Sequence, residues 1–236
     1  MYDTYIFIEK REHMSINTND YIDRHLKNID LIKPEDIPNI DLYMDQVTTF
    51  MEDHLGRLKR TDDDKILTKT MINNYAKNDL LPSPEKKKYS KDHVLLLTFI
   101  YYFKSFLTIG DIKALTGDLT ENYFKSGKKT TLADIYSVLL DSFPNIMDSF
   151  KSDIDNVCGL TEKCMENTDS SDSYLEKFFF ISLLGIDVYM KKQMIEAMID
   201  DMAAEQLAKA EAAKAAAKKA ADKEKKNNSK EDKADK

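Results

Sequence analysis

The feature that most restricts the fold of this chain is its shortage of residues that break helices. The 236 residues include only 6 glycines and 5 prolines, whereas Leu, Lys, Glu, Met and Ala are plentiful. Glycine and proline are the residues least compatible with a helix interior, and the abundant types are good helix formers. The composition therefore predicts an all-α protein.

The spacing of apolar residues predicts four helices in the middle of the chain. Asp41, Thr68 and Ser90 have side chains that can accept hydrogen bonds from a first helical turn, so we expect them to be N-caps. Gly117 suits a C-cap and should end the fourth helix. We expect the helices at 41–56, 68–78, 90–106 and 111–117.

A polar stretch after Gly117 separates these helices from a second helical region. Apolar spacing predicts helices over 131–157 and 172–202 with a polar loop between them, so no long uninterrupted helix is expected here. From Ala203 onward alanine and lysine dominate. This composition predicts a helix that gives way to disorder after about Asp222.

The sequence favours a cytoplasmic protein that is not an enzyme. Cys158 and Cys164 are too few for a disulfide framework, and their spacing does not suit a structural zinc site. The longest apolar run, Phe178 to Ile186, is shorter than the roughly 18 residues of a membrane span. No phosphate loop, paired catalytic carboxylates or Ser/His/Asp arrangement is visible. We therefore expect no membrane partner, no metal and no cofactor.

Positive charge is concentrated in one short part of an acidic chain. The net charge is −7, but positions 65–91 hold seven lysines against only Asp79 and Glu85. Three of these lysines, Lys86 to Lys88, follow one another in the turn between the second and third helices. A run of lysines is most often a solvated surface, but it also suits an anionic partner such as the DNA backbone.

The order helix, turn, helix, basic turn, helix is the layout of a winged helix-turn-helix. In that fold the second helix enters the major groove of double-stranded DNA, and the wing contacts the backbone. Asn, Lys and Thr side chains can contact base edges or phosphates. The residues that we expect to contact DNA are Thr68, Lys69, Thr70, Asn73, Asn74, Lys77, Lys86, Lys87, Lys88 and Tyr89.

A Leu-Leu-Pro exit, a lysine turn ending in Tyr-Ser, and a Leu-Thr-Ile-x-x-Ile-Lys element follow one another between residues 70 and 117. This pattern resembles the DNA-binding domain of the MerR family. The resemblance implies a winged helix-turn-helix that binds promoter DNA. Asp79 stands where that family has a glycine, and the wing lacks the family's arginines. Residues 36–202 also resemble an uncharacterised bacterial family with a domain of unknown function, presumed to be regulators.

Together these patterns predict a transcriptional regulator made of four parts. Phe178, Phe179, Phe180 and Tyr189 lie on a segment too apolar for an exposed helix, so we expect a homodimer interface or a ligand pocket there. The four parts are an N-terminal extension (1–35), a MerR-like winged helix-turn-helix (36–117), an acidic helical domain for dimerisation or sensing (118–202), and a low-complexity tail (203–236).

Two other interpretations of the sequence stay open. One is a non-catalytic adaptor whose winged-helix fold no longer binds DNA and which docks proteins through its apolar helices. The other is a metal-responsive sensor that uses Cys158 and Cys164. The sequence does not identify an effector, an operator or the sign of regulation.

Overall fold

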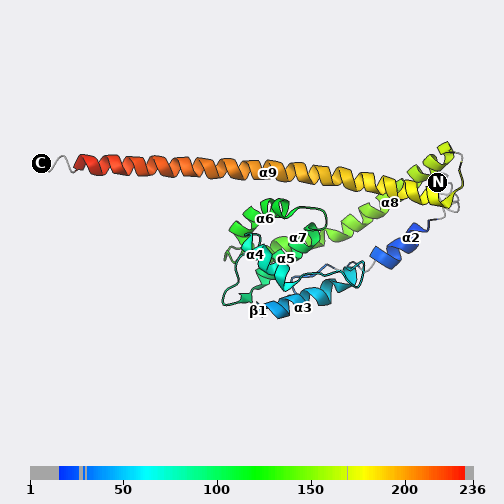
Figure 1. Ribbon diagram of the computed structural model, residues 1–236, viewed down its shortest axis with the longest axis horizontal. Helices are drawn as coiled ribbons and strands as arrows, with labels where there is room; N and C mark the ends of the chain where they lie inside the picture. The colour runs from blue at the N-terminus through cyan, green and yellow to red at the C-terminus, as the bar shows by residue number, and fades with distance from the viewer. Residues whose placement is uncertain (1–15, 27–28, 30, 169, 232–236) are drawn as a thin grey trace.

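The computed structural model describes residues 16–26, 29, 31–168 and 170–231, which are mostly helical, and the prediction of an all-α protein is confirmed. Figure 1 shows a helical body and one very long helix, α9, which passes along the body and extends beyond it. The elements are α2 (Thr18–Tyr21), η2 (Ile22–Leu26), β1 (Leu42–Tyr43), α3 (Met44–Leu55), η3 (Gly56–Leu58), α4 (Lys69–Lys77), β2 (Lys88–Tyr89), α5 (Lys91–Phe103), α6 (Ile109–Tyr123), α7 (Leu132–Asp141), α8 (Phe143–Thr168) and α9 (Ser173–Glu231).

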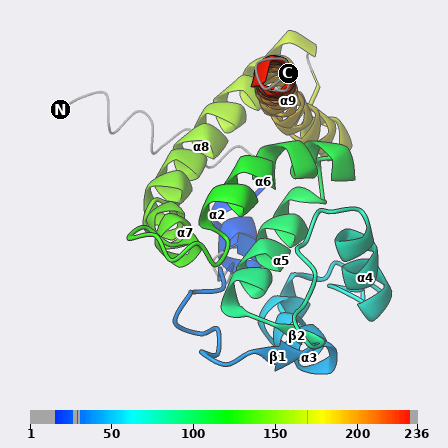
Figure 2. The same cartoon turned by 90° about the vertical axis from the view of Figure 1, so that its left-hand side faces the viewer.

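Helix α5 is the centre of the body. Every residue from His93 to Ile100 is buried. A helix that is apolar on all sides is stable only when other elements surround it, and each buried aliphatic side chain contributes about 1.5–3 kcal/mol. Figure 2 shows α5 in the middle of the body, with α3, α4, α6 and α7 around it. These helices contribute the buried residues Val47, Met51, Leu55, Ile72, Tyr75, Ile112, Leu132 and Tyr136.

Polar side chains set the starts of α4 and α5, as expected. The Oγ1 atom of Thr68 accepts a hydrogen bond from the Met71 N–H at 3.1 Å. Ser90 is the N-cap of α5, and its own backbone N–H donates to Nδ1 of His93 at 2.9 Å. Both predicted N-caps are therefore confirmed.

The first expected helix begins later than its sequence indicates. Leu42 and Tyr43 form strand β1, and Tyr43 rather than Asp41 is the N-cap of α3. Strand β1 pairs antiparallel with β2, with Leu42 opposite Tyr89 and Tyr43 opposite Lys88. The pairing partner lies more than 40 residues away in the chain, so no local pattern reveals that these residues are extended.

Helix α6 continues through Gly117, where the sequence indicates an end. A glycine ends a helix when it takes the left-handed conformation, and Gly117 does not. It lies instead where α9 crosses α6, because a Cβ at this position would be 3.8 Å from the side chain of Gln206. Gln206 Nε2 also donates to the carbonyl oxygen of Ala114 at 3.3 Å. A side-chain carbon at 117 would make only an ordinary contact with Gln206, so the packing does not require a glycine, and the domain end expected at 117 falls inside a helix.

The core of the body includes residues well beyond that position. Leu132 and Tyr136 of α7 and Ile199 of α9 belong to the same buried cluster as α3, α4 and α5. The Tyr136 ring meets the Phe99 ring of α5 edge-on, with centroids 5.2 Å apart. Helices α3, α4 and α5 therefore share one core with α7 and α9.

The expectation that no long helix follows Gly117 is wrong. Helix α8 has 26 residues, and α9 has 59. At 1.5 Å per residue α9 is about 90 Å long. It packs against α8 and α6 and stays helical past Asp222 to Glu231, where disorder was expected. Residues 223–231 contain no alanine, but lysine and glutamate, which are also good helix formers, make up most of them. Within the described residues, no helix is long and apolar enough to cross a membrane.

Candidate functional site

Helix α4 presents most of the predicted DNA-contacting side chains on one side. Ile72 and Tyr75 are buried and hold the helix against the body. Positions three or four apart lie on the same side of a helix. The exposed positions of α4 are spaced in this way from one another, so they share the side opposite the two buried residues. The exposed surface, which we call the α4 face, consists of Lys69, Thr70, Asn73, Asn74 and Lys77.

Two of the predicted contact residues at the start of α4 already have partners. Thr68 is half-buried, and its hydroxyl oxygen caps the helix. Lys69 forms an ion pair with Asp45 of α3. Both groups of this pair are exposed, so it contributes about 0–1 kcal/mol and can be exchanged for another anion.

A tight turn between α4 and β2 carries the consecutive lysines. The Lys88 N–H donates to the Glu85 carbonyl oxygen at 2.9 Å, so these four residues form a two-residue turn that we call the lysine turn (Glu85–Lys88). Lys86 and Lys87, its exposed central residues, have φ values of 50° and 65°. Turns of this kind favour Asn and Gly, because the left-handed conformation costs a residue with a Cβ roughly 1–2 kcal/mol.

The two predicted contact residues of strand β2, Lys88 and Tyr89, differ in exposure. Lys88 is half-buried, and its Nζ lies 5.3 Å from the centre of the Tyr43 ring. Tyr89 is only 3% exposed, and burial raises its pKa. Successive side chains on a strand point to opposite faces, so pairing with Leu42 turns Tyr89 inward. The Tyr89 ring is packed in the core, and a contact of this residue with DNA stays a prediction.

His93 packs under the strand that follows the lysine turn, a role that the sequence analysis did not predict. It is fully buried, and burial lowers its pKa. Its ring meets those of Tyr89 and Phe124 edge-on, at 5.4 Å and 4.8 Å between centroids. The signal that was missed is the spacing Ser-x-x-His, in which His93 occupies the place of the Glu or Gln of a capping box.

Lysines at the two ends of helix α6 contact the end of α4 and the lysine turn. Near its start, Lys113 Nζ donates to the Asn78 carbonyl oxygen at 3.0 Å and lies 3.5 Å from Oδ2 of Asp79. Just past its end, Lys125 Nζ donates to Oε1 of Glu85 at 2.8 Å. Asp79 has a φ of 55°, a left-handed conformation that a glycine would adopt without strain. One helix therefore fixes the α4 face relative to the lysine turn.

The aromatic residues predicted at an interface lie on α9, away from α4. Phe178 and Tyr189 are 52% and 62% exposed, whereas Phe179 and Phe180 are half-buried. The expectation that this segment is too apolar to be exposed does not hold within a single chain. We call the exposed apolar residues of α9 the α9 strip, which runs along the helix and, at 3.6 residues per turn, around most of it; it consists of Tyr174, Phe178, Ile181, Ile186, Val188, Tyr189, Met190, Met194, Met198 and Leu207.

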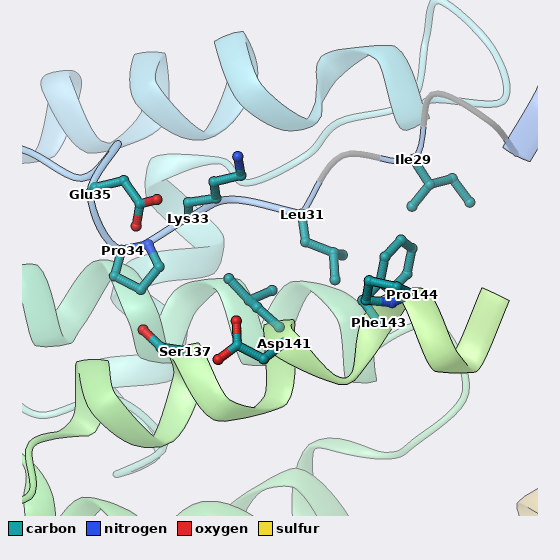
Figure 3. A pocket seen from close by; sticks show the side chains of 10 residues that line it. Ile29, Leu31, Lys33, Pro34, Glu35, Ser137, Asp141, Phe143 and Pro144 are labelled. Carbon is teal, nitrogen blue, oxygen red and sulfur yellow. The ribbon is translucent and has the colours of Figure 1, made fainter. Parts of the chain in front are cut away.

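A hollow of about 430 Å³ lies where the segment before β1 meets the junction of α7 and α8. Figure 3 shows Ile29, Phe143 and Pro144 at one end of it and Glu35 and Ser137 at the other. Its volume is in the range of small-molecule sites. Its charged lining side chains are exposed, so they do not define a ligand chemistry.

The two cysteines are poorly placed to share one metal ion. Cys158 and Cys164 lie on α8, where six residues correspond to about 9 Å along the axis. Both are half-buried. Among the described residues there is no group of three or more His, Cys, Asp or Glu side chains arranged to hold a metal ion.

Comparison with known proteins gives one match, to a family model that covers part of the chain. Residues 32–139 match the model of DUF1836, a domain of unknown function. The matched region extends from the segment before β1 into α7 and contains the α4 face, the lysine turn and α6. No curated protein and no solved structure matches the chain. The match includes Leu132 and Tyr136 of the buried cluster but ends before Ile199 of α9, which belongs to the same cluster.

Proposed function

We propose that this protein is a cytoplasmic DNA-binding transcriptional regulator with a MerR-like winged helix-turn-helix between β1 and α6. The order β1, α3, α4, lysine turn, β2, α5 is compatible with that fold, in which a short ribbon supports the wing. In this arrangement α4 is the helix that enters the major groove, and the lysine turn is the wing that contacts phosphates.

The observation that carries the proposal is the conformation of Lys86 and Lys87. Both residues are left-handed, and both side chains are exposed at the tip of the turn. Backbone strain of this kind persists in proteins mainly where function requires the residue. Two mobile ammonium groups at a projecting tip suit neighbouring phosphates, because each contact releases condensed counterions from the DNA.

The α4 face has the side chains that base reading requires. An asparagine can bond an adenine through two hydrogen bonds, so Asn73 and Asn74 are the residues that we assign to sequence recognition. Lys69 and Lys77 lie at the two ends of the face and suit the backbone on either side of the groove. Lys69 would exchange Asp45 for a phosphate on binding.

A regulator of this type reads two half-sites and needs two copies. We assign the contact between copies to the α9 strip, because ten large apolar side chains exposed along one helix exceed what a monomeric protein usually leaves in water. Sedimentation at micromolar concentration should give about twice the 27.2 kDa mass of one chain.

The adaptor function is the second candidate, and the same strip favours it. A protein that docks partners through an apolar helix also exposes such residues, and the chain as a whole is acidic. The two candidates differ in their response to salt. Phosphate contacts weaken steeply as salt rises, whereas contacts between apolar surfaces do not.

The experiment that tests the proposal separates the α4 face from the lysine turn. A library of duplexes with random sequence is selected with the wild-type chain, with N73A/N74A and with K86A/K87A. If α4 reads bases, N73A/N74A changes the selected sequences; if the turn holds the backbone, K86A/K87A keeps the sequences and weakens all of them. Recovery of no duplex by the folded wild-type chain would favour the adaptor.

A further inference from the structure

A second group of lysines lies beside the lysine turn, in the loop that joins α6 to α7. Lys125 begins this loop, and its Nζ is 2.8 Å from Oε1 of Glu85. Its backbone N–H donates to Oδ2 of Asp92, in the first turn of α5, at 2.7 Å. Because Glu85 is the first residue of the lysine turn, the loop and the tip of the turn are neighbours in space.

The loop is held in a defined conformation. Lys125 and Gly127 have φ values of 46° and 62°, so Lys125 is a third lysine in the left-handed conformation at this place. Lys128 Nζ lies 5.0 Å from the centre of the Tyr123 ring, which orients that side chain. Lys128 and Lys129 are both exposed. We call residues 125–129 the α6–α7 loop.

Three carboxylates act on Lys125, those of Glu85, Asp41 and Asp92, and two of them contact it directly. Glu85 pairs with Lys125, which lowers the pKa of Glu85 and raises that of Lys125. Asp92 accepts the backbone N–H of Lys125. Glu85 and Lys125 neutralise each other, so the exposed charges of Lys128 and Lys129 lie beside those of the lysine turn, and Asp41 and Asp92 are the remaining negative charges near Lys125.

We propose that Lys128 and Lys129 form a second phosphate contact next to the lysine turn, on the backbone of duplex DNA beyond the part that α4 reads. This inference rests on the proposed DNA-binding function. Duplex DNA is stiff over tens of base pairs and carries a phosphate for about every 1.7 Å of its axis. A duplex that touches the tip of the turn therefore offers further phosphates to a neighbouring loop. Lysines suit this contact, because backbone contacts position the protein without reading sequence.

The test measures how DNA affinity depends on salt. A fluorescent duplex of about 30 base pairs is titrated with the wild-type chain and with K128Q/K129Q at several salt concentrations, because each phosphate contact adds about 0.9 to the slope of log K against log salt. The slope should fall by about 1.8 per bound protomer in K128Q/K129Q. The affinity ratio between the two proteins should widen about 12-fold between roughly 200 mM and 50 mM salt.

Two further variants make the outcome specific. K128R/K129R keeps both charges and should keep the wild-type slope. K151Q/K163Q removes two exposed lysines of α8, far along the chain from the turn, and should also leave the slope unchanged. If the wild type binds the duplex and K128Q/K129Q has the same slope, this inference is wrong while the proposed function stands. If the wild type does not bind at all, the proposed function itself fails.

Discussion

Replacing the two strained lysines should stabilise the protein and weaken its binding to DNA. In the variant K86N/K87G, Asn and Gly occupy the left-handed positions that they favour in a two-residue turn. Relief of strain at two positions raises the free energy of unfolding by about 2 kcal/mol. The added freedom of glycine in the unfolded chain lowers it by about 1 kcal/mol. The net gain of about 1 kcal/mol raises the Tm by about 2–4 °C for a chain of this length.

The same variant loses two phosphate contacts. Its slope of log K against log salt should be about 1.8 smaller than that of the wild type. Thermal unfolding monitored by circular dichroism and titration of a fluorescent duplex measure the two effects on the same protein. The opposite signs are the important result, because a change that merely damages the fold lowers both stability and affinity.

The variant K86A/K87A is the matched control for strain. Alanine keeps the Cβ and hence the strain, but it removes the charge. It should bind DNA as weakly as K86N/K87G without the gain in Tm. A K86N/K87G protein that melts below the wild type would refute the account of strain, and one that binds as tightly as the wild type would refute the role of the charges.

Four other changes test separate parts of the structure. Thr68→Ala removes the N-cap of α4 and should lower the free energy of unfolding by about 1 kcal/mol in urea titrations; an unchanged value would contradict the capping role. Burial lowers the pKa of His93 below its usual 6.5, so the unfolded chain takes up a proton first as pH falls; stability should drop below about pH 6.5 by up to about 1.4 kcal/mol per pH unit, and His93→Gln should flatten that part of the curve. Leu132→Ala opens a cavity in the core beyond residue 117 and should lower the free energy of unfolding by about 2–5 kcal/mol; a value that hardly changes would indicate an independent domain that ends at 117. The variant F178E/Y189E should sediment as a monomer with an unchanged circular dichroism spectrum, and a persistent dimer would place the contact elsewhere.

Local patterns in the sequence are sufficient for the parts of the fold that depend on neighbours in the chain. The capping side chains of Thr68 and Ser90 act within three residues, and both N-caps are confirmed. The spacing of Ile72 and Tyr75 likewise predicts which side of α4 is buried. Each of these features is decided by groups a few residues apart, so the sequence alone determines it.

The parts that the sequence does not reveal depend on distant partners. Tyr89 is turned inward because its strand pairs with Leu42, and the side chain beside Gly117 of α6 is Gln206, from the distant helix α9. Lys125 gains its role only when the fold brings Glu85 to it. The long helices were missed for another reason. Apolar side chains lie around most of α9 rather than on one packed side, so the periodic signal of a packed helix is weak there.

The central claim is that the lysine turn holds the phosphates of DNA. The most direct test is to titrate the wild-type chain and K86A/K87A with one fluorescent duplex, taken from the DNA upstream of the coding region of this protein, over a range of salt concentrations. The account predicts that wild-type affinity falls linearly on a log–log plot and that the variant gives a line whose slope is smaller by about 1.8. Binding that is the same for both proteins, or that does not change with salt, would contradict it.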